Sequence, residues 1–287
     1  MTVHGLAADR RTSWVPPLPL IGVKFLELRR RRTLMIVTTL FTVALPVIFY
    51  AIRAIYHASS PAHYAAAGEP DAFATVGTLM DEFGFIIAAV LGATAATADL
   101  TDGMFRHLVI TGRSRLALYL ARVPAGLAIL LPLAAVGFTL ACLVTGFAHS
   151  PLIPGEVIPS AGAMTRSGLW LELDLVIGFT VGLGLGSLMG QRTIPVILLI
   201  VLEIILTPRI VTHTLPHLIN GERLIIGVAM AQLKPAALAG GTVITPQGAA
   251  AGPHLPPMPT WALITVIAGW ILGWSAIGAW KMITRDA

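Results

Sequence analysis

Six long apolar runs, separated by short polar segments, are the main pattern along the chain. A hydrocarbon core of about 30 Å needs roughly 20 helical residues, so runs of this length predict helices that span a membrane. The expected spans are residues 34–52, 73–98, 120–147, 169–190, 194–207 and 261–280. The fifth has only 14 residues and contains Glu203, which makes it short, broken or re-entrant after Pro208. Trp261 and Trp280 bound the sixth, as aromatic residues do at the two surfaces of a membrane.

Composition supports this interpretation and limits the function classes. Of 287 residues, 56% are hydrophobic and 11% are charged, whereas typical soluble domains have about 45–50% and about 25%. A large water-soluble enzyme is therefore excluded. The single cysteine, Cys142, cannot form a disulfide within the chain. We expect an all-α fold with a cytoplasmic tail and interfacial helix at residues 1–33 and a single six-span domain at residues 34–287.

The distribution of positive charge predicts the orientation. Fourteen of the 19 Lys and Arg residues fall on the side that carries both termini, and cytoplasmic loops have an excess of such residues. Both termini are therefore predicted to lie in the cytoplasm, with the protein in the plasma membrane. Residues 1–33 are too polar and too basic for a cleaved signal peptide, so we expect the first span to remain as an anchor.

A short amphipathic segment precedes the first span. Its apolar residues recur at helical spacing, at Leu18, Ile21, Phe25 and Leu28. Lys24 and Glu27 fall on other faces, as does the arginine run at 29–32. The pattern predicts a helix, including Glu27, that lies on the cytoplasmic leaflet. The alternative is a polybasic stretch that only sets the topology.

Small residues repeat every four positions in two of the expected spans. The fourth span carries Gly178, Gly182, Gly186 and Gly190, and the second carries Gly84, Ala88, Gly92 and Ala96. Gly269 and Gly273 form a shorter pair in the sixth. Helices in a membrane approach each other closely through such stripes. We expect them to be packing faces, either within one subunit or between subunits.

The segment at residues 99–122, between the second and third spans, combines charge with an amphipathic pattern. Apolar residues lie on one side of a potential helix, at Met104, Phe105, Leu108 and Val109. Gly112 ends this helix. An apolar face with a basic rim is suited to binding a groove on another protein. The alternative is an ordinary connector held in the cytoplasm by its arginines, which does not account for the apolar face.

The same segment resembles a motif of a known family. The relevant residues are Asp102, Gly103, Met104, Phe105, Arg106, Leu108, Thr111, Arg113, Ser114, Arg115 and Arg122. Their order is similar to the acidic-Gly-Thr-Leu-Arg, Pro-x-Ser-Arg, Lys/Arg pattern of ABC transporter permeases of the type-2 exporter class. The chain differs at Met104 and Phe105, where Thr and Leu are usual, and at Gly112, where Pro is commonest. The six expected spans and the basic amphipathic helix before them also match that class.

The resemblance implies a role for each cytoplasmic element. In the family this loop is a coupling helix that docks into a groove on a separate cytoplasmic ATPase, and the first amphipathic helix contacts that subunit too. It assigns coupling to residues 102–115 and ATPase contact to residues 18–32. It further implies two ATPase subunits, a second permease copy or paralogue, surrounding lipids and no nucleic acid. ATP and Mg²⁺ would bind the ATPase, and this chain would hold no cofactor and catalyse no reaction.

Two other functions compete with the exporter. Asp99, Asp102 and Gly103 begin like the metal motif of CDP-alcohol phosphotransferases, but no further paired aspartates follow to complete a metal site. An ion-coupled secondary transporter could use Glu203 as its ion site, since carboxylates inside a membrane are costly and functional. Internal repeats with matched broken helices, which such transporters often show, are not evident. A non-transporting sensor subunit is a third possibility.

The remaining polar residues are expected on the outside. Residues 208–259 form an external region in which the apolar patch 224–231 predicts a re-entrant or interfacial helix. His213 and His217 are separated by Pro216, which favours solvated loop histidines over a metal site. Four acids, Asp81, Glu82, Glu172 and Asp174, are expected to be hydrated near the outer surface. The transported molecule is predicted only to be hydrophobic or amphipathic.

Overall fold

The computed structural model describes residues 15–101, 103, 114–148, 158–202, 221, 223–239 and 258–284. Over these residues the fold is all-helical. In chain order the elements are α2 (Leu18–Arg30), α3 (Arg32–Thr39), the π-helical turn η1 (Leu40–Ala44), α4 (Leu45–Ser59), α5 (Pro70–Thr101), α7 (Arg115–Phe147), α8 (Ala161–Met189), α9 (Thr193–Ile200), α12 (Ile226–Leu233), the 3₁₀ turn η3 (Ala236–Leu238) and α13 (Thr260–Thr284).

Five of the described helical segments are long and apolar enough to cross a membrane. They are the continuous segment α3–η1–α4, then α5, α7, α8 and α13. They define a multi-pass helical membrane protein. Of the expected span at residues 194–207, α9 and residues 201–202 are described, and Glu203 lies outside the described residues. A sixth span therefore stays a prediction.

The helices are longer than the apolar runs that predicted them. The first segment covers Arg32–Ser59 instead of residues 34–52, and α8 begins at Ala161 instead of residue 169. Hydropathy marks the part of a helix that fits hydrocarbon, whereas the helix continues until its backbone hydrogen bonds end. At α8 the start is set by Ser160, whose Oγ accepts a hydrogen bond from the Ala163 N–H at 3.2 Å.

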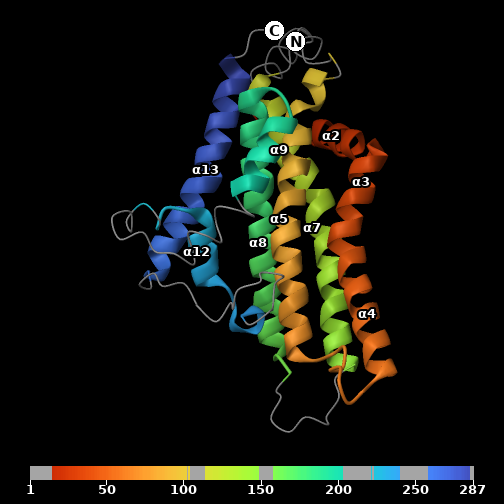
Figure 1. Ribbon diagram of the computed structural model, residues 1–287. Helices are drawn as coiled ribbons and strands as arrows, with labels where there is room; N and C mark the ends of the chain where they lie inside the picture. The colour runs from red at the N-terminus through yellow and green to blue at the C-terminus, as the bar shows by residue number, and fades with distance from the viewer. Residues whose placement is uncertain are drawn as a thin grey trace, which may run out of the picture.

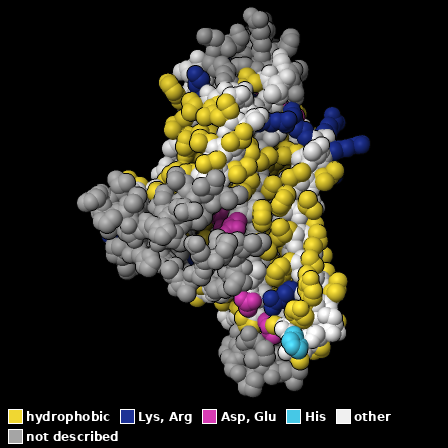
Figure 2. Space-filling view, in the orientation of Figure 1, with side chains coloured by type: hydrophobic (Ala, Val, Ile, Leu, Met, Phe, Trp, Pro, Cys, Tyr) yellow, Lys and Arg dark blue, Asp and Glu magenta, His cyan; other side chains and the backbone are white. Residues whose placement is uncertain are grey.

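The long helices form an elongated bundle with α5 and α8 at its centre (Figure 1). Within the most apolar stretch of each helix, 78% of the residues of α5 and α8 are buried, against 22% in α3–η1–α4, 28% in α7 and 17% in α13. On the face seen in Figure 2, hydrophobic side chains cover the surfaces of α3–η1–α4 and α13. This surface is suited to lipid or to another membrane-embedded subunit.

The contact between α5 and α8 uses the two predicted stripes of small residues. A Cβ added to Gly178 would lie 2.7 Å from the Phe85 oxygen, and one added to Gly186 would lie 2.9 Å from the Ala93 Cα. At Gly182, midway between them, it would overlap the Ala89 backbone. The contacts advance by four residues on both helices together, so α5 and α8 run parallel in a constant register. The stripes therefore pack within one subunit.

Three glycines predicted to pack against other helices, Gly190, Gly269 and Gly273, are not part of the α5–α8 contact described above. Gly190 has φ +70° and ends α8 in the left-handed conformation that glycine adopts without strain. A Cβ on Gly269 or Gly273 would meet nothing within 4 Å. These two glycines therefore make no close contact with the described part of this chain, and their packing against another subunit stays a prediction.

One end of the bundle carries α2, the last turn of α5, the first turn of α7 and the last turn of α13; we call it the α2 end. Figure 1 shows α2 lying across the bundle, turned away from the direction of α3. The turn falls at Arg31, whose φ of −77° and ψ of 83° are not helical. A helix is thus present over the predicted residues, and it lies across the direction of the spanning helices.

The buried face of α2 differs from the predicted one. Leu20, Lys24 and Leu28 are buried, whereas Leu18 is 82% exposed. The apolar periodicity placed Lys24 on a polar face, yet the lysine is the centre of the buried stripe. The reason is a buried acid on another helix, described below.

Near the middle of the bundle, α12 and η3 pack beside α13, α5 and α8. Trp170 Nε1 donates to the Met230 oxygen at 3.2 Å, and Trp270 Nε1 donates to the Leu224 oxygen at 2.8 Å. The predicted helix at 224–231 is therefore present as α12, with Val228 and Ala229 fully buried against the bundle. His213 and His217 lie outside the described residues.

Candidate functional site

A buried ion cluster lies at the α2 end, where three helices meet. Asp99 in the last turns of α5, Arg122 of α7 and Lys24 of α2 are 2%, 1% and 5% exposed. Arg122 donates from one terminal nitrogen to Asp99 Oδ2 at 2.6 Å, and Lys24 Nζ donates to Asp99 Oδ1. Lys24 also reaches Glu27 Oε2 at 2.9 Å. The two cations and two carboxylates balance in charge, which is what makes their burial tolerable.

Arg122 also contacts groups other than the Asp99 carboxylate. Its second terminal nitrogen donates to the Ala96 backbone oxygen at 2.8 Å and lies 4.0 Å from Met282 Sδ of α13. Arg115, the first residue of α7, donates to the Ile283 oxygen at 2.9 Å. The planar guanidinium can serve several acceptors at fixed angles, as an ammonium cannot. Arginine side chains of α7 therefore connect α5 and α13 at this end.

The cluster joins the two helices that flank the predicted coupling segment, α5 and α7. Asp99 lies three residues before Asp102, where that segment begins, and Arg115 is its last residue. Gly103 has φ +68°, and its N–H donates to the Leu100 oxygen at 3.3 Å, so it ends α5 in a left-handed conformation. The other residues assigned to coupling lie outside the described residues: Asp102, Met104, Phe105, Arg106, Leu108, Thr111 and Arg113.

The sequence patterns single out Asp99, Arg122 and Lys24 separately but do not predict that these three residues are in contact. Asp99 was considered only as a metal ligand, Arg122 only as the end of the family motif, and Lys24 as a solvated residue. One signal was available, because a charged residue near the end of an apolar helix generally needs a partner. The partner of Lys24 is 75 positions away in the chain, which periodicity does not reveal.

No metal site emerges from the part of the chain that the structure describes. Nowhere in it do three or more His, Cys, Asp or Glu side chains converge. Both oxygens of Asp99 accept hydrogen bonds from cations, so this carboxylate is already neutralised. The geometry of Asp99 therefore favours a structural ion cluster over the metal ligand of a phosphotransferase.

The acids expected to be hydrated have more specific surroundings. Asp81 Oδ2 lies 3.4 Å from Lys234 Nζ, and this lysine sits 5.4 Å from the centre of the Trp170 ring. Asp174 is only 6% exposed. The expectation of simple hydration is therefore wrong for Asp174, because α8 lies at the centre of the bundle instead of at its surface.

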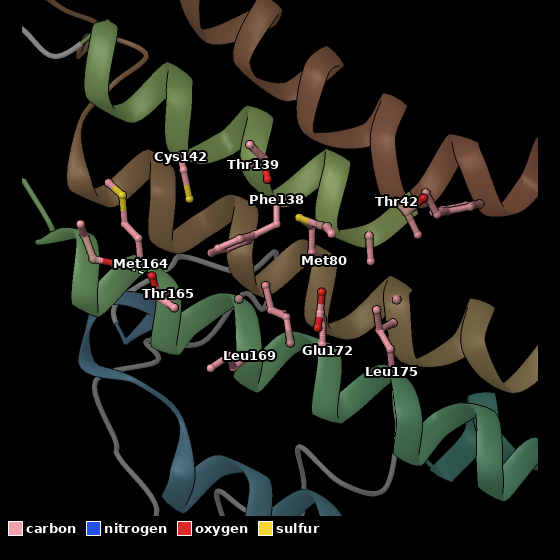
Figure 3. A pocket seen from close by; sticks show the side chains of 17 residues that line it. Thr42, Met80, Phe138, Thr139, Cys142, Met164, Thr165, Leu169, Glu172 and Leu175 are labelled. Carbon is pink, nitrogen blue, oxygen red and sulfur yellow. Dashed lines mark hydrogen bonds between the residues drawn. The ribbon is translucent and has the colours of Figure 1, made fainter. Parts of the chain in front are cut away.

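Glu172 lines a cavity of about 380 Å³ among η1, α5, α7 and α8. The surrounding side chains are largely apolar, and Glu172 extends among them toward Met80 of α5 (Figure 3). Cys142 and Phe138 of α7 line the same space. A Cβ on Gly137 of α7 would overlap the Thr42 oxygen of η1, so the wide π-helical turn and α7 touch through their backbones beside the cavity.

Comparison with known proteins gives no match, either to a family model or to a curated protein. The function has to be inferred from the motif and the geometry of the chain.

Proposed function

We propose that this chain is the permease subunit of an ATP-driven ABC exporter of the type-2 class, which moves a hydrophobic or amphipathic substrate across the plasma membrane. Support comes from the motif between Asp102 and Arg122, from the helix α2 before the first span and from the five helices that are long and apolar enough to cross a membrane. In this proposal both termini and the α2 end face the cytoplasm, and residues 194–207, which begin in α9, form a sixth span.

One observation carries the proposal: the Lys24–Asp99–Arg122 cluster joins α5 and α7, the helices on either side of the 102–113 connection, to α2. A loop that receives force from a partner transmits it only if its ends are fixed to the helices that must move. The cluster supplies such a joint, since separating its buried charges would cost several kcal/mol. An ordinary connector has no need of three buried charges at its ends.

The mechanism would be alternating access. Two ATPase subunits bind ATP and Mg²⁺, and their closure displaces the 102–113 connection on each of two permease subunits, which are identical or paralogous. Because α5 and α8 touch along their backbones, they move together as one unit, while the more sparsely packed α3–η1–α4 and α13 can shift against lipid. The ATPase must contact the two states with different free energies, or its cycle could not drive the change.

The cavity around Glu172 lies beside this central pair. A displacement of α5 and α8 relative to η1 and α7 would change its volume, which makes it a candidate part of the substrate path. The chain itself would not hydrolyse ATP. Glu203, the ion site of the competing secondary-transporter hypothesis, stays a prediction of the sequence.

The test is co-purification of the tagged chain with an ABC ATPase from its native membranes. We expect the unaltered protein to retain the ATPase and the double variant Phe105→Glu/Leu108→Glu to lose it, with membrane insertion unchanged. The matched control is Ile55→Glu/Tyr56→Glu, which introduces the same two charges at exposed positions near the C-terminus of α4, away from the α2 end. This control should retain the ATPase.

Failure at either step is informative. If the unaltered chain brings down no ABC ATPase, the exporter proposal is contradicted. If the Phe105/Leu108 variant retains the ATPase as well as the control does, the loop is not the docking element. Transport that persists without ATP and stops when the proton gradient is dissipated would favour the ion-coupled alternative.

A further inference from the structure

A second basic feature lies beside α2, separate from the buried cluster. Where α2 turns into α3, a groove of about 550 Å³ opens between these helices, the outer face of α5 and the start of α9. Arg31, Arg32 and Arg192 line its mouth. Figure 2 shows Lys and Arg side chains gathered at this junction, directly above a wide hydrophobic surface.

The mouth of the groove is strongly cationic. Among its lining residues there is no Asp or Glu. Arg31 approaches Glu27 at 4.0 Å, whereas no ion pair involves Arg32 or Arg192 within the residues that the structure describes. Arg192 also precedes α9 without a side-chain cap, and Arg192 and Thr193, at the N-terminus of that helix, both line the groove. Two guanidinium groups and a helix N-terminus together attract an anion.

The wall of the groove is apolar. It is formed by Leu34 and Val37 of α3, Val90 of α5, and Val196 and Ile197 of α9. Val37 lies about 7.5 Å along α3 from Arg32, and Val196 about 6 Å along α9 from Arg192, at 1.5 Å per residue. The groove is thus polar at the α2 end and apolar toward the middle of the bundle. Ile197 is 56% exposed, so the groove opens sideways onto the hydrophobic surface.

We propose that this groove binds an anionic phospholipid of the leaflet at the α2 end, with its phosphate between Arg32 and Arg192 and an acyl chain along the apolar wall. A free phosphate would match the arginines equally well but would leave the wall empty. A lipid satisfies both parts, and basic pockets at this depth between membrane helices are suited to anionic headgroups. The bound lipid would bridge the α2–α3 turn and α9. The proposal requires only that the helices span a membrane and does not depend on an ATPase partner.

The test is native mass spectrometry of the whole protein after exchange into micelles containing equal amounts of phosphatidylglycerol and phosphatidylcholine. We expect the unaltered protein to retain phosphatidylglycerol preferentially. The double variant Arg32→Ala/Arg192→Ala should lower that retention by at least about tenfold, because two charges near the headgroup are removed. The matched control Arg29→Ala/Arg30→Ala removes the same charge from exposed positions on α2 and should change retention less than about twofold.

Two further measurements separate the lipid from its phosphate. Val37→Trp, which fills the apolar wall, should reduce phosphatidylglycerol retention, and soluble glycerol phosphate should not displace the lipid. If both double arginine variants lost phosphatidylglycerol equally, the retention would depend on the overall surface charge and not on this groove, and the proposal would be overturned. Equal retention of both lipids, or displacement by glycerol phosphate, would also overturn it. Thermal unfolding of each variant, expected to match the unaltered protein, checks that the fold is intact.

Discussion

Asp99 and Asp81 lie on the same helix, yet their surroundings differ. They are 18 residues apart on α5, or about 27 Å at the usual helical rise. Asp99 is buried between Lys24 and Arg122, at 2.6 Å from the latter. Asp81 has one partner, Lys234, at 3.4 Å, and both side chains are more than a fifth exposed.

The pattern extends beyond α5. Toward the end away from α2, Arg53 lies 3.8 Å from Glu69 and 3.6 Å from Asp71, again longer than the contact between Arg122 and Asp99. Residues 83–98 of α5, between the two aspartates, carry no charge, and the separation matches a hydrocarbon thickness of about 30 Å. One polar layer is therefore buried and tightly paired and the other is partly exposed and loosely paired, as the proposed drive from the α2 end would require.

The largest effect is expected for Asp99→Ala, which leaves the buried Arg122 without its acid and Lys24 with Glu27 alone. Breaking a buried pair costs about 3–5 kcal/mol, so the free energy of unfolding should fall by that amount in detergent denaturation. Asp81→Ala, the matched change at the other layer, should cost less than about 1 kcal/mol, since partly exposed pairs contribute little. Equal losses would show that the two layers do not differ.

A smaller effect is expected midway between the layers. Gly182→Ala inserts a methyl group where α8 meets the Ala89 backbone, and such overpacking costs about 1–3 kcal/mol. The control Gly269→Ala adds the same group where nothing lies within 4 Å. It should be neutral, or stabilising by up to about 1 kcal/mol from helix propensity. Thermal unfolding of both variants in the same detergent measures the difference; similar melting temperatures would contradict the close α5–α8 contact.

Arg122→Lys should weaken the joint without removing its charge. The ammonium can still pair with Asp99 but cannot also reach the Ala96 oxygen in the same geometry. Loss of this hydrogen bond from a charged donor should lower the free energy of unfolding by about 1.5–3 kcal/mol at most. Arg166→Lys, on an exposed position of α8, should leave it unchanged. A neutral result at Arg122 would mean that charge alone holds the cluster.

The smallest effect is expected for Lys234→Met. It removes the partly exposed pair with Asp81 and the contact with Trp170, each worth at most about 1 kcal/mol. Because exposed pairs are screened by salt, the difference between Lys234→Met and the unaltered protein should shrink as ionic strength rises. If Lys234→Met lowered the free energy of unfolding as much as Asp99→Ala, and if salt did not change that loss, the Asp81–Lys234 pair would not be the weaker of the two.

Prediction from the sequence succeeded where a property belongs to one helix. The five apolar spans and the helix at α2 follow from local hydropathy and periodicity, and the stripes at Gly84, Gly92 and Gly182 follow from spacing. The same reasoning wrongly placed Lys24 on an exposed face of its helix, because an analysis of apolar periodicity assigns every lysine to the polar side. Spacing also did not reveal that Gly190 ends α8 with a positive φ.

The amino-acid sequence by itself determined that this is a multi-pass helical protein, because transfer of a long apolar run out of water depends on that run alone. It also carries the motif on which the exporter proposal rests. Only the tertiary structure decided that α5 pairs in parallel with α8, that Asp99 neutralises Lys24 and Arg122, and that Arg32 faces the same groove as Arg192. These contacts join distant segments, and their free energy depends on distances and burial that exist only after the helices have packed.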